Sequence, residues 1–440
     1  MLIEHAIKYG ENKGVEVEIY YLRAKRFDVS VEKNIVKKAQ ENIEEGMGIR
    51  VICDGALGFT YLSNPTEDKI EKAIDLAIKL AEVHKGNYES FPEVGNSGDY
   101  DSYDPKIKEM SEEECIEKVM DIVRGAQDKN KNSIVSSADF SCGIFSRKIA
   151  NSSGEVGDKG TFVSATAFTV IPTNPPSVGM DFALHSKLGD INPYDVGKNS
   201  AKMAMSGLDR KTLEEKPKEV IFSPLASREF FGILVQYLSG VSLRRKQSPL
   251  LGKLGEKVFS ENLNIYCEEE NNPFGRGFDD EGVPTKKRYL VEKGVIKNFA
   301  LDMVSAKKMD MDTIGFATRS GVNFRSRPEG VPYTVKVDGN SENLVEEVDK
   351  GIIVNYVTGL HTINYETGDF SVGTMAPVLY IERGEVKYAV KNVMLSGNLV
   401  DMFSSAVMGK DNKFLPLFPL RIMNFGIVPS VRVDKISVVS

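Results

Sequence analysis

Polar and apolar residues alternate along residues 15–32, VEVEIYYLRAKRFDVSVE, with the two-residue period of a strand that buries one face. Residues 46–62 predict one or two more strands, interrupted by the turn pair Asp54-Gly55. A helix is expected over residues 1–13. A second, amphipathic helix is expected over 64–84, with Asn64 as its cap and Pro65 at its first position. Its apolar stripe is Ile70, Ala73, Ile74, Ala77 and Ile78.

The same order of elements then returns. A helix between residues 102 and 127 has Ser111 and Glu114 as its capping box, strands follow over 133–187, and another helix starts at Asn192-Pro193. The order helix, several strands, Asn-Pro helix therefore occurs twice in the first ~210 residues, which predicts an internal duplication. The alternative is that Asn-Pro is simply a common helix start.

The charged, proline-bearing stretch DRKTLEEKPK (209–218) is the best boundary in this chain of 440 residues, whose length favours two domains. We predict an α+β protein. Residues 1–212 would form a domain of antiparallel strands and helices, and residues 213–440 a β-rich domain with one buried helix.

The predicted buried helix covers residues 225–239, after a strand and the cap Ser223 with Pro224. This helix is apolar on nearly all sides. Glu229 is its only acidic residue and lies next to Arg228, so the helix is not expected to bind a metal or act as a general base. Beyond it, the hairpins LVEKGVIKN (290–298) and YIERGEVKY (380–388) share their turn pattern and an aspartate 13 positions before the turn Glu. They represent either a structural repeat or two examples of a common turn.

Charge and composition exclude several classes of protein. The net charge of −7 makes generic binding to nucleic acid or to an anionic membrane unfavourable. The uncharged, strongly apolar stretch at 230–243 has 14 residues, which is too short to span a bilayer. The mixed charges and short apolar run of residues 1–14 are not those expected of a signal peptide, and we expect a cytoplasmic protein. The four cysteines form no CxxC pair and are expected to be reduced and mostly buried, and no two of the four histidines are neighbours, which excludes a local histidine metal site.

Candidate ligand-binding residues lie in four segments. Arg244 and Arg245, followed by Lys246, would leave an extended segment on opposite sides and either clamp a carboxylate or phosphate or form a solvated basic patch. Three basic residues in the probable loop 318–330 would anchor acidic groups or be solvated: Arg319, Arg325 and Arg327.

The acidic run Asp279, Asp280 and Glu281 would bind a hard cation or pair with the basic residues 286–288. Asp369 and Ser371 follow Gly368 in a tight turn, where the aspartate is expected to organise backbone amides. No serine-hydrolase elbow, HExxH, Cys–His pairing or phosphate loop is present, so no residue is assigned a catalytic role.

The second half resembles the TldD/PmbA family, also called the modulator of DNA gyrase family. The resemblance is carried by RRKQSPLLGKLGEKVFS, FDDEGVPTKKRYLVEKGVIKNFALDMVSAKKM, TGDFSVGTMAPVLYIERGEVKYAVKNVMLSGNLVDMF and PLRIMNFGIVPSVRVDKISV, in that order. In the TldD branch a helix before the paired arginines carries HExxxH, which binds zinc. Here those positions fall on Phe231, Gly232 and Gln236, and no cysteine follows Cys267 to complete a zinc site.

The resemblance therefore implies the PmbA (TldE) branch. It implies a subunit without zinc or any other cofactor, which pairs with a TldD-like, zinc-binding HExxxH paralogue as a heterodimer, binds unfolded peptide and shapes the chamber. Two alternatives stay open. One is an autonomous hydrolase that uses the acidic run with Asp369 and His361, and the other is an interaction protein of a toxin–gyrase system. Whether the chain also forms a homodimer is left open.

Overall fold

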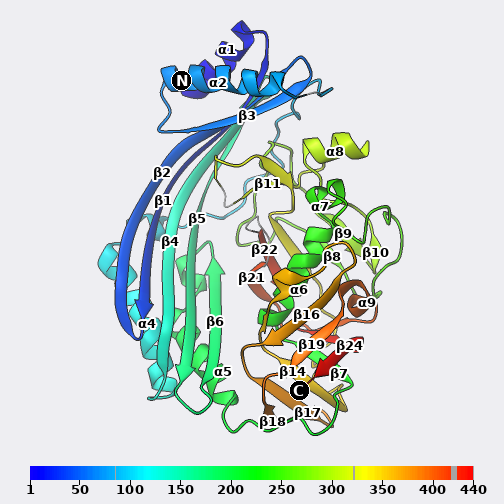
Figure 1. Ribbon diagram of the computed structural model, residues 1–440. Coiled ribbons are helices and arrows are strands. Elements are labelled where there is room, and N and C mark those ends of the chain that lie inside the picture. Colours follow the sequence, from blue (N-terminus) through cyan, green and yellow to red (C-terminus); the bar gives the residue numbers. More distant parts are fainter. Residues whose placement is uncertain (85, 321–322, 418–423, 440) are drawn as a thin grey trace.

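The structure, a computed structural model, describes residues 1–84, 86–320, 323–417 and 424–439. It is an α+β protein, as predicted. A long, curved antiparallel sheet forms one side of the molecule, and several sheets of shorter strands around a central helix form the other (Figure 1). The long sheet comes from residues 16–185 and the shorter strands from residues 219–439, while the predicted boundary at 212/213 stays a prediction.

The N-terminal part contains the same unit twice: a helix, three antiparallel strands and a helix. The first unit consists of α1 (Leu2–Asn12), β1 (Glu16–Glu32), β2 (Ile35–Cys53), β3 (Ala56–Ser63) and α2 (Glu67–Glu82). After the short helix α3 (Pro105–Glu109), the second consists of α4 (Glu112–Lys129), β4 (Ile134–Asn151), β5 (Gly154–Ile171), β6 (Ser177–His185), the 3₁₀ turn η1 (Leu188–Asp190) and α5 (Pro193–Ser206). β1 and β4 pair antiparallel, which joins the units into one sheet of order β3-β2-β1-β4-β5-β6. The predicted repetition of elements is confirmed.

Close packing of the third strand against the following helix is also repeated. A Cβ atom on Gly58 of β3 would lie 1.9 Å from the carbonyl oxygen of Ala77 in α2. A Cβ atom on Gly179 of β6 would lie 2.1 Å from the carbonyl oxygen of Ser200 in α5. Both positions therefore require glycine for the same reason, which strengthens the case for two structurally equivalent units.

The two Asn-Pro segments start their helices differently. Asn192 caps α5 by accepting a hydrogen bond from the Tyr194 amide, and Pro193 is the first residue of the helix. Asn64, in contrast, ends β3 in a left-handed conformation (φ 50°), and Thr66 is the residue that precedes α2. The predicted cap at Asn64 is therefore wrong. The capping box of Ser111 and Glu114 at the start of α4 is confirmed.

The C-terminal part has two six-stranded sheets, one four-stranded sheet and a two-stranded ribbon within the described residues. The first sheet has the order β10 (Val295–Ile296), β9 (Arg288–Glu292), β8 (Ile265–Cys267), β13 (Thr334–Val337), β22 (Asn424–Val428), β21 (Lys413–Leu417). The second has the order β18 (Glu385–Val390), β17 (Val378–Glu382), β14 (Lys350–Val354), β7 (Glu219–Phe222), β23 (Val431–Val433), β20 (Val407–Met408). The four-stranded sheet is β15 (Val357–Thr358), β16 (Asp369–Thr374), β19 (Met394–Asn398), β24 (Ile436–Val439), and the ribbon is β11 (Ala317–Arg319) with β12 (Pro328–Gly330). The remaining helical segments are α6 (Pro224–Tyr237), α7 (Gly240–Arg244), α8 (Met303–Met309), η2 (Leu360–Thr362) and α9 (Leu399–Phe403).

Helix α6 is the centre of the larger hydrophobic core, as predicted. Twelve of its 14 residues are buried, and its side chains pack against strands of all three larger sheets. Phe230 lies 4.6 Å from Phe222 of β7 and 5.3 Å from Phe370 of β16, measured between ring centroids. The helix therefore stabilises this half by apolar burial on every side.

The two similar hairpins each form the outer strand pair of a six-stranded sheet. Lys293-Gly294 and Arg383-Gly384 turn them with positive φ at both residues. The aspartates that precede them at equal distance are not equivalent, because the Asp279 side chain is buried and the Asp369 side chain is exposed. The common turn, rather than a longer repeat, accounts for the resemblance between the hairpins.

Candidate functional site

The acidic run lies at the junction between the long sheet and the C-terminal part. The Asp280 carboxylate accepts hydrogen bonds from Arg147 of β4 (2.6 Å), from Arg276 (3.0 Å) and from the Arg319 amide (2.6 Å). Burial would raise the pKa of Asp280, but the guanidinium groups of Arg276 and Arg147 outweigh it and lower that pKa. Asp280 is therefore an ionised carboxylate, and both of its oxygens accept hydrogen bonds. It links the long sheet to the C-terminal part.

Glu281 forms a second connection between the two parts. Its carboxylate accepts a hydrogen bond from Arg50 of β2 at 2.6 Å and another from the Met303 amide at 2.8 Å. Arg50 also donates to Glu18 of β1 at 2.8 Å, and Glu18 pairs with Arg319 at 3.4 Å. Burial raises the pKa of Glu281 to about 8, although the Arg50 guanidinium opposes the shift.

Asp279 organises the turn that carries its two neighbours. Its carboxylate accepts hydrogen bonds from the amides of Glu281, Val283 and Ala317, at 2.8 to 3.0 Å. Burial raises the pKa of Asp279 to about 6, and these amides oppose the shift. The side chain thus has a structural role at the base of the turn.

These contacts correct the predictions for the acidic run. The three side chains are at most 1% exposed and their oxygens are bonded, so they present no free carboxylate to a cation or a peptide. Asp279 accepts from backbone amides, and Asp280 and Glu281 pair with arginines outside the predicted residues 286–288. Lys287, for example, pairs with Glu268 at 2.8 Å. Within the described residues, no group of three or more His, Cys, Asp or Glu side chains is arranged to hold a metal ion.

The positions of the degenerate zinc motif lie in the second half of α6. Phe231 and Gly232 are buried, and the Phe231 ring packs 5.2 Å from the ring of Phe403 in α9. Gln236 is half-buried, and its side-chain carbonyl oxygen has no hydrogen-bond partner in the described part of the chain. A phenyl ring, a glycine and one amide supply no strong zinc ligand, so α6 cannot form the HExxxH zinc site.

Arg244 and Arg245 occupy the end of the short helix α7, not an extended segment as predicted. Arg244 is half-buried and donates a hydrogen bond to the Ser305 hydroxyl at 3.4 Å, while Arg245 is exposed. Arg245 is therefore the more accessible of the pair for an acidic group.

Asp369 and Ser371 are exposed on β16, in the four-stranded sheet. Hydrogen bonds from Thr367 (2.6 Å) and Asn398 (2.9 Å) lower the pKa of Asp369. The side chain thus accepts from other side chains and does not organise backbone amides, which Asn364 does in this turn. His361 is exposed in the nearby turn η2.

The three arginines of the loop 318–330 also separate. Arg319 is fully buried in the charge network at the junction, and Arg325 pairs with Glu44 of β2, whereas Arg327 is exposed. The structure thus divides the predicted site residues into a buried structural set and an exposed set on different elements.

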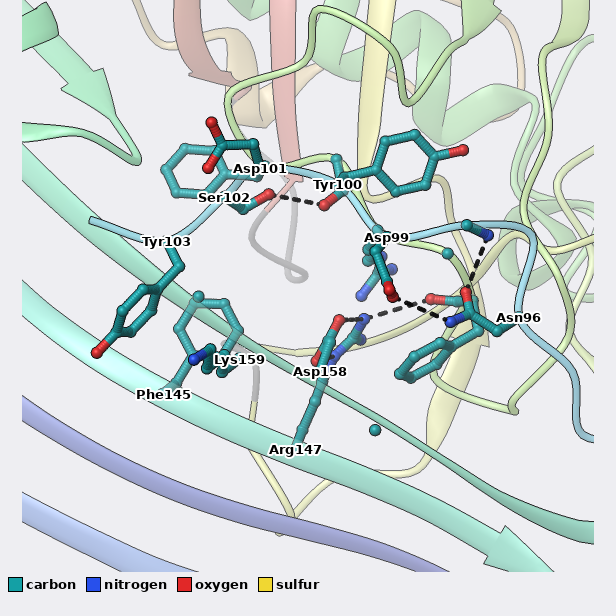
Figure 2. Close-up of a pocket in the computed structure, with 18 of the residues that line it drawn as sticks. Asn96, Asp99, Tyr100, Asp101, Ser102, Tyr103, Phe145, Arg147, Asp158 and Lys159 are labelled. Carbon is teal, nitrogen blue, oxygen red and sulfur yellow. Dashed lines mark hydrogen bonds and ion pairs between the residues drawn. The ribbon is translucent and has the colours of Figure 1, made fainter. Parts of the chain in front are cut away.

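Sequence reasoning missed a cavity of about 400 Å³ at this junction (Figure 2). Its walls are β4 and β5, the loop 274–278 with Tyr333, and a segment of the α2–α3 connection, residues 94–104, which we call the strap. The strap is held by hydrogen bonds from the Ser97 amide to Gly277 (3.0 Å) and from the Ser102 hydroxyl to Gly275 (2.8 Å). The Thr161 amide of β5 also donates to the Ser102 carbonyl oxygen (2.9 Å). The strap has no periodic pattern, so only its tertiary contacts identify it.

None of the described helices combines the length and apolar character needed to cross a membrane.

Comparison with known proteins gives matches over both parts of the chain. Residues 215–440 match the PmbA/TldA metallopeptidase C-terminal domain, and residues 17–81 match domain 1 of the same metallopeptidases. An uncharacterised protein of Methanocaldococcus jannaschii is 27% identical, over 92% of this chain and 94% of its own length. Metalloprotease PmbA of Escherichia coli O157:H7 is 24% identical, over 93% of this chain and 90% of its own. The crystal structure of TldE from Thermococcus kodakarensis superposes with a TM-score of 0.90 at 26% identity and covers 100% of both chains.

Proposed function

The chain belongs to the PmbA/TldD metallopeptidase family, and we propose that it is the non-zinc subunit of a peptidase complex that processes unfolded peptides. The proposed partner is a TldD-like paralogue with an HExxxH helix, which would supply the zinc. The likeness to a TldE structure over the full length supports assignment to the non-zinc branch. The proposed compartment is the cytoplasm, which agrees with four cysteines that are all free.

The observation that carries the proposal is the packing of α6. At the positions of the zinc motif this helix has a buried phenylalanine and a buried glycine within the hydrophobic core. Peptide hydrolysis by zinc requires imidazole or carboxylate ligands and a water held on the metal. A chain with this helix depends on a partner for that chemistry.

Its own proposed contribution is to hold peptide and complete the chamber. The exposed candidates for this role are Arg245, Asp369 and Ser371, while Arg244 is half-buried and donates a hydrogen bond to Ser305. Arg245 would attract an acidic group of the peptide or of the partner. Asp369 and Ser371 lie in a four-stranded sheet, whose free edge could accept an extended peptide as an added strand.

The test is reconstitution. The purified chain, an HExxxH paralogue and the mixture are assayed for zinc content and for cleavage of an unfolded casein. We expect substoichiometric zinc and no cleavage for the chain alone, and cleavage by the mixture that exceeds the sum of the separate proteins. Zinc near one per chain with chelator-sensitive cleavage by the chain alone would overturn the proposal. Cleavage without zinc that is lost in a folded Asp369→Ala protein would favour an autonomous hydrolase instead.

A substitution within α6 sharpens the test. Gln236→Ala should leave cleavage by the mixture within about twofold of wild type, because an unligated amide contributes nothing to zinc chemistry. Replacement of either histidine in the partner's HExxxH should abolish cleavage. A loss of activity in the Gln236→Ala mixture, with the complex intact by size-exclusion chromatography, would place a catalytic role on this chain.

A further inference from the structure

The long sheet has a step beside the cavity, where β5 extends beyond its outer neighbour. β5 pairs with β4 from residue 154 to residue 170, whereas β6 pairs only with residues 163–171 of β5. The outer edge of β5 before residue 163 therefore has no neighbouring strand among the described residues. Residues 157–160 of this stretch form part of the cavity wall.

One contact with the strap shows which backbone groups face this edge. The Thr161 amide donates to the Ser102 carbonyl oxygen at 2.9 Å, so the backbone of Thr161 faces outward, away from β4. Alternate residues of a strand direct their N–H and C=O groups to the same edge, so Lys159 and Gly157 face outward as well. Both residues are exposed, and in the described part of the chain no hydrogen bond reaches their backbone from that side. They therefore present two N–H and C=O pairs to which a further strand can bind.

The strap does not occupy this edge. At one end the Val94 amide donates to the Ser153 hydroxyl at 2.9 Å, and at the other end Ser102 makes the contact with β5 given above. Between these two contacts the strap is bonded to Gly277 and Gly282 of the C-terminal part, and no hydrogen bond among the described residues links it to β5. In Figure 2 the strap passes above the cavity, and Asp158 of β5 lies below it.

A glycine makes the edge accessible to another backbone. Gly157 has no side chain to cover its own N–H and C=O groups, which is the usual reason for glycine where a second chain approaches closely. The equivalent edge in the first unit is residues 35–45 of β2, because β3 pairs only with residues 46–53. Every residue of that stretch carries a side chain. The open, glycine-bearing edge is thus a feature of the second unit, where it adjoins the cavity.

We propose that residues 155–159 of β5 bind an extended peptide as an added strand, with one apolar side chain of the peptide in the cavity under the strap. Main-chain hydrogen bonds of this kind bind peptides with little dependence on sequence, as unfolded substrates require. Every second side chain of the added strand would face the concave side of the sheet. There the cavity, of about 400 Å³, is lined by the half-buried rings of Tyr100, Phe145 and Tyr333. The choice of a peptide as ligand rests on the proposed function.

Backbone recognition is tested with peptides that differ only in their N–H groups. The chain has no tryptophan, so isothermal titration calorimetry on the isolated, full-length chain is the suitable measurement. The probes are acetyl-Thr-Val-Leu-Val-Thr-amide, the same peptide N-methylated at both valines, and the same peptide N-methylated at the leucine and the last threonine. Only one edge of the peptide can face β5, so one methylated peptide should bind within about twofold of the parent and the other at least fivefold more weakly. Absence of binding by the parent, or equal binding by all three peptides, would overturn the inference.

Two substitutions at one position then locate the site. Lys159→Pro removes the outward N–H group and no hydrogen bond to β4, so it should weaken the parent peptide about threefold to tenfold. Lys159→Ala is the matched control, because it removes the side chain and its contact with the Tyr103 ring but retains the N–H group, and its affinity should stay within about twofold of wild type. Circular dichroism with thermal unfolding verifies that both variants fold. Equal affinities of the two variants, with binding still sensitive to N-methylation, would assign the peptide to another sheet edge and overturn the inference.

The outcomes separate this inference from the proposed function. Cleavage by the reconstituted mixture together with peptide binding that is insensitive to Lys159→Pro refutes the β5 site alone. Binding that depends on the β5 edge, in a chain that supports no cleavage with any HExxxH paralogue, refutes the proposed function alone.

Discussion

At the scale of single residues, the buried carboxylates of the junction predict how stability depends on pH. Burial raises the pKa of Glu281 to about 8 and that of Asp279 to about 6, above their ordinary values of 4.5 and 3.8. The folded protein therefore retains protons that the unfolded chain has released, and these two groups destabilise the fold as the pH rises from about 4 to about 8. Each contributes at most about 1.4 kcal/mol per pH unit to this slope.

The measurement is the midpoint of thermal unfolding between pH 5 and pH 8. The Glu281→Gln variant, which has no titratable group at this position, should lose less stability across the range than wild type. Parallel curves for the two proteins would show that Glu281 is ionised throughout, with Arg50 offsetting its burial completely.

Local information was sufficient for one residue-scale prediction, the capping box of α4, but not for the cap at Asn64. The capping box of Ser111 and Glu114 depends on residues three positions apart, and the structure contains it. The pair of Arg50 and Glu281 depends on residues 231 positions apart and on how the long sheet meets the C-terminal part. Similarly, Cys115 and Cys142 show no motif in the sequence, yet α4 and β4 bring their sulfur atoms to 3.7 Å. Partner choice of this kind follows from tertiary packing, which a local pattern does not encode.

At the scale of elements, the crossing of α4 and α5 explains two helical glycines. A Cβ atom on Gly197 would lie 1.8 Å from the Ile122 carbonyl oxygen, and one on Gly125 would lie 1.9 Å from the Tyr194 carbonyl oxygen. Alanine normally stabilises a helix interior relative to glycine by about 1 kcal/mol. Here it must push two backbones apart, so the packing cost exceeds the propensity gain.

We therefore predict that Gly197→Ala destabilises the protein by about 1–3 kcal/mol in chemical denaturation. Gly189→Ala is the matched control, because a Cβ atom there meets no atom within 4 Å, and its effect should stay within about 0.5 kcal/mol. A neutral or stabilising Gly197→Ala would mean that the two helices separate at little cost.

Elements were the most predictable level, because hydrophobic periodicity reports directly on burial. The apolar residues of α6 predicted a buried helix, and strand alternation predicted β1. The start of α2 was predicted two residues early, because Asn64 adopts a left-handed turn conformation after β3 and does not cap the helix. The cavity under the strap was invisible at this level, since its walls come from three separate segments.

At the scale of the whole molecule, a buried charge network joins the long sheet to the C-terminal part. Asp280 lies at its centre and accepts hydrogen bonds from two buried guanidinium groups and one amide. A buried network of this kind adds little net stability compared with apolar packing, but loss of one member leaves the others uncompensated. The network is thus a means of fixing the relative position of the two parts.

Asp280→Ala should lower the free energy of unfolding by about 3–5 kcal/mol. The contact between the long sheet and the C-terminal part should open before either part unfolds. Hydrogen exchange followed by mass spectrometry should show faster exchange in the strap and in residues 274–285, with the centres of β4 and β5 still protected.

Asp280→Asn retains one acceptor oxygen and should give an intermediate effect. Glu155→Ala is the control, since it removes an exposed partner of Lys148 on the same two strands and should cost less than about 1 kcal/mol. Uniformly faster exchange in Asp280→Ala, with no earlier change at the junction, would show that the two parts unfold as one unit and that the network does not hold them as a separable contact.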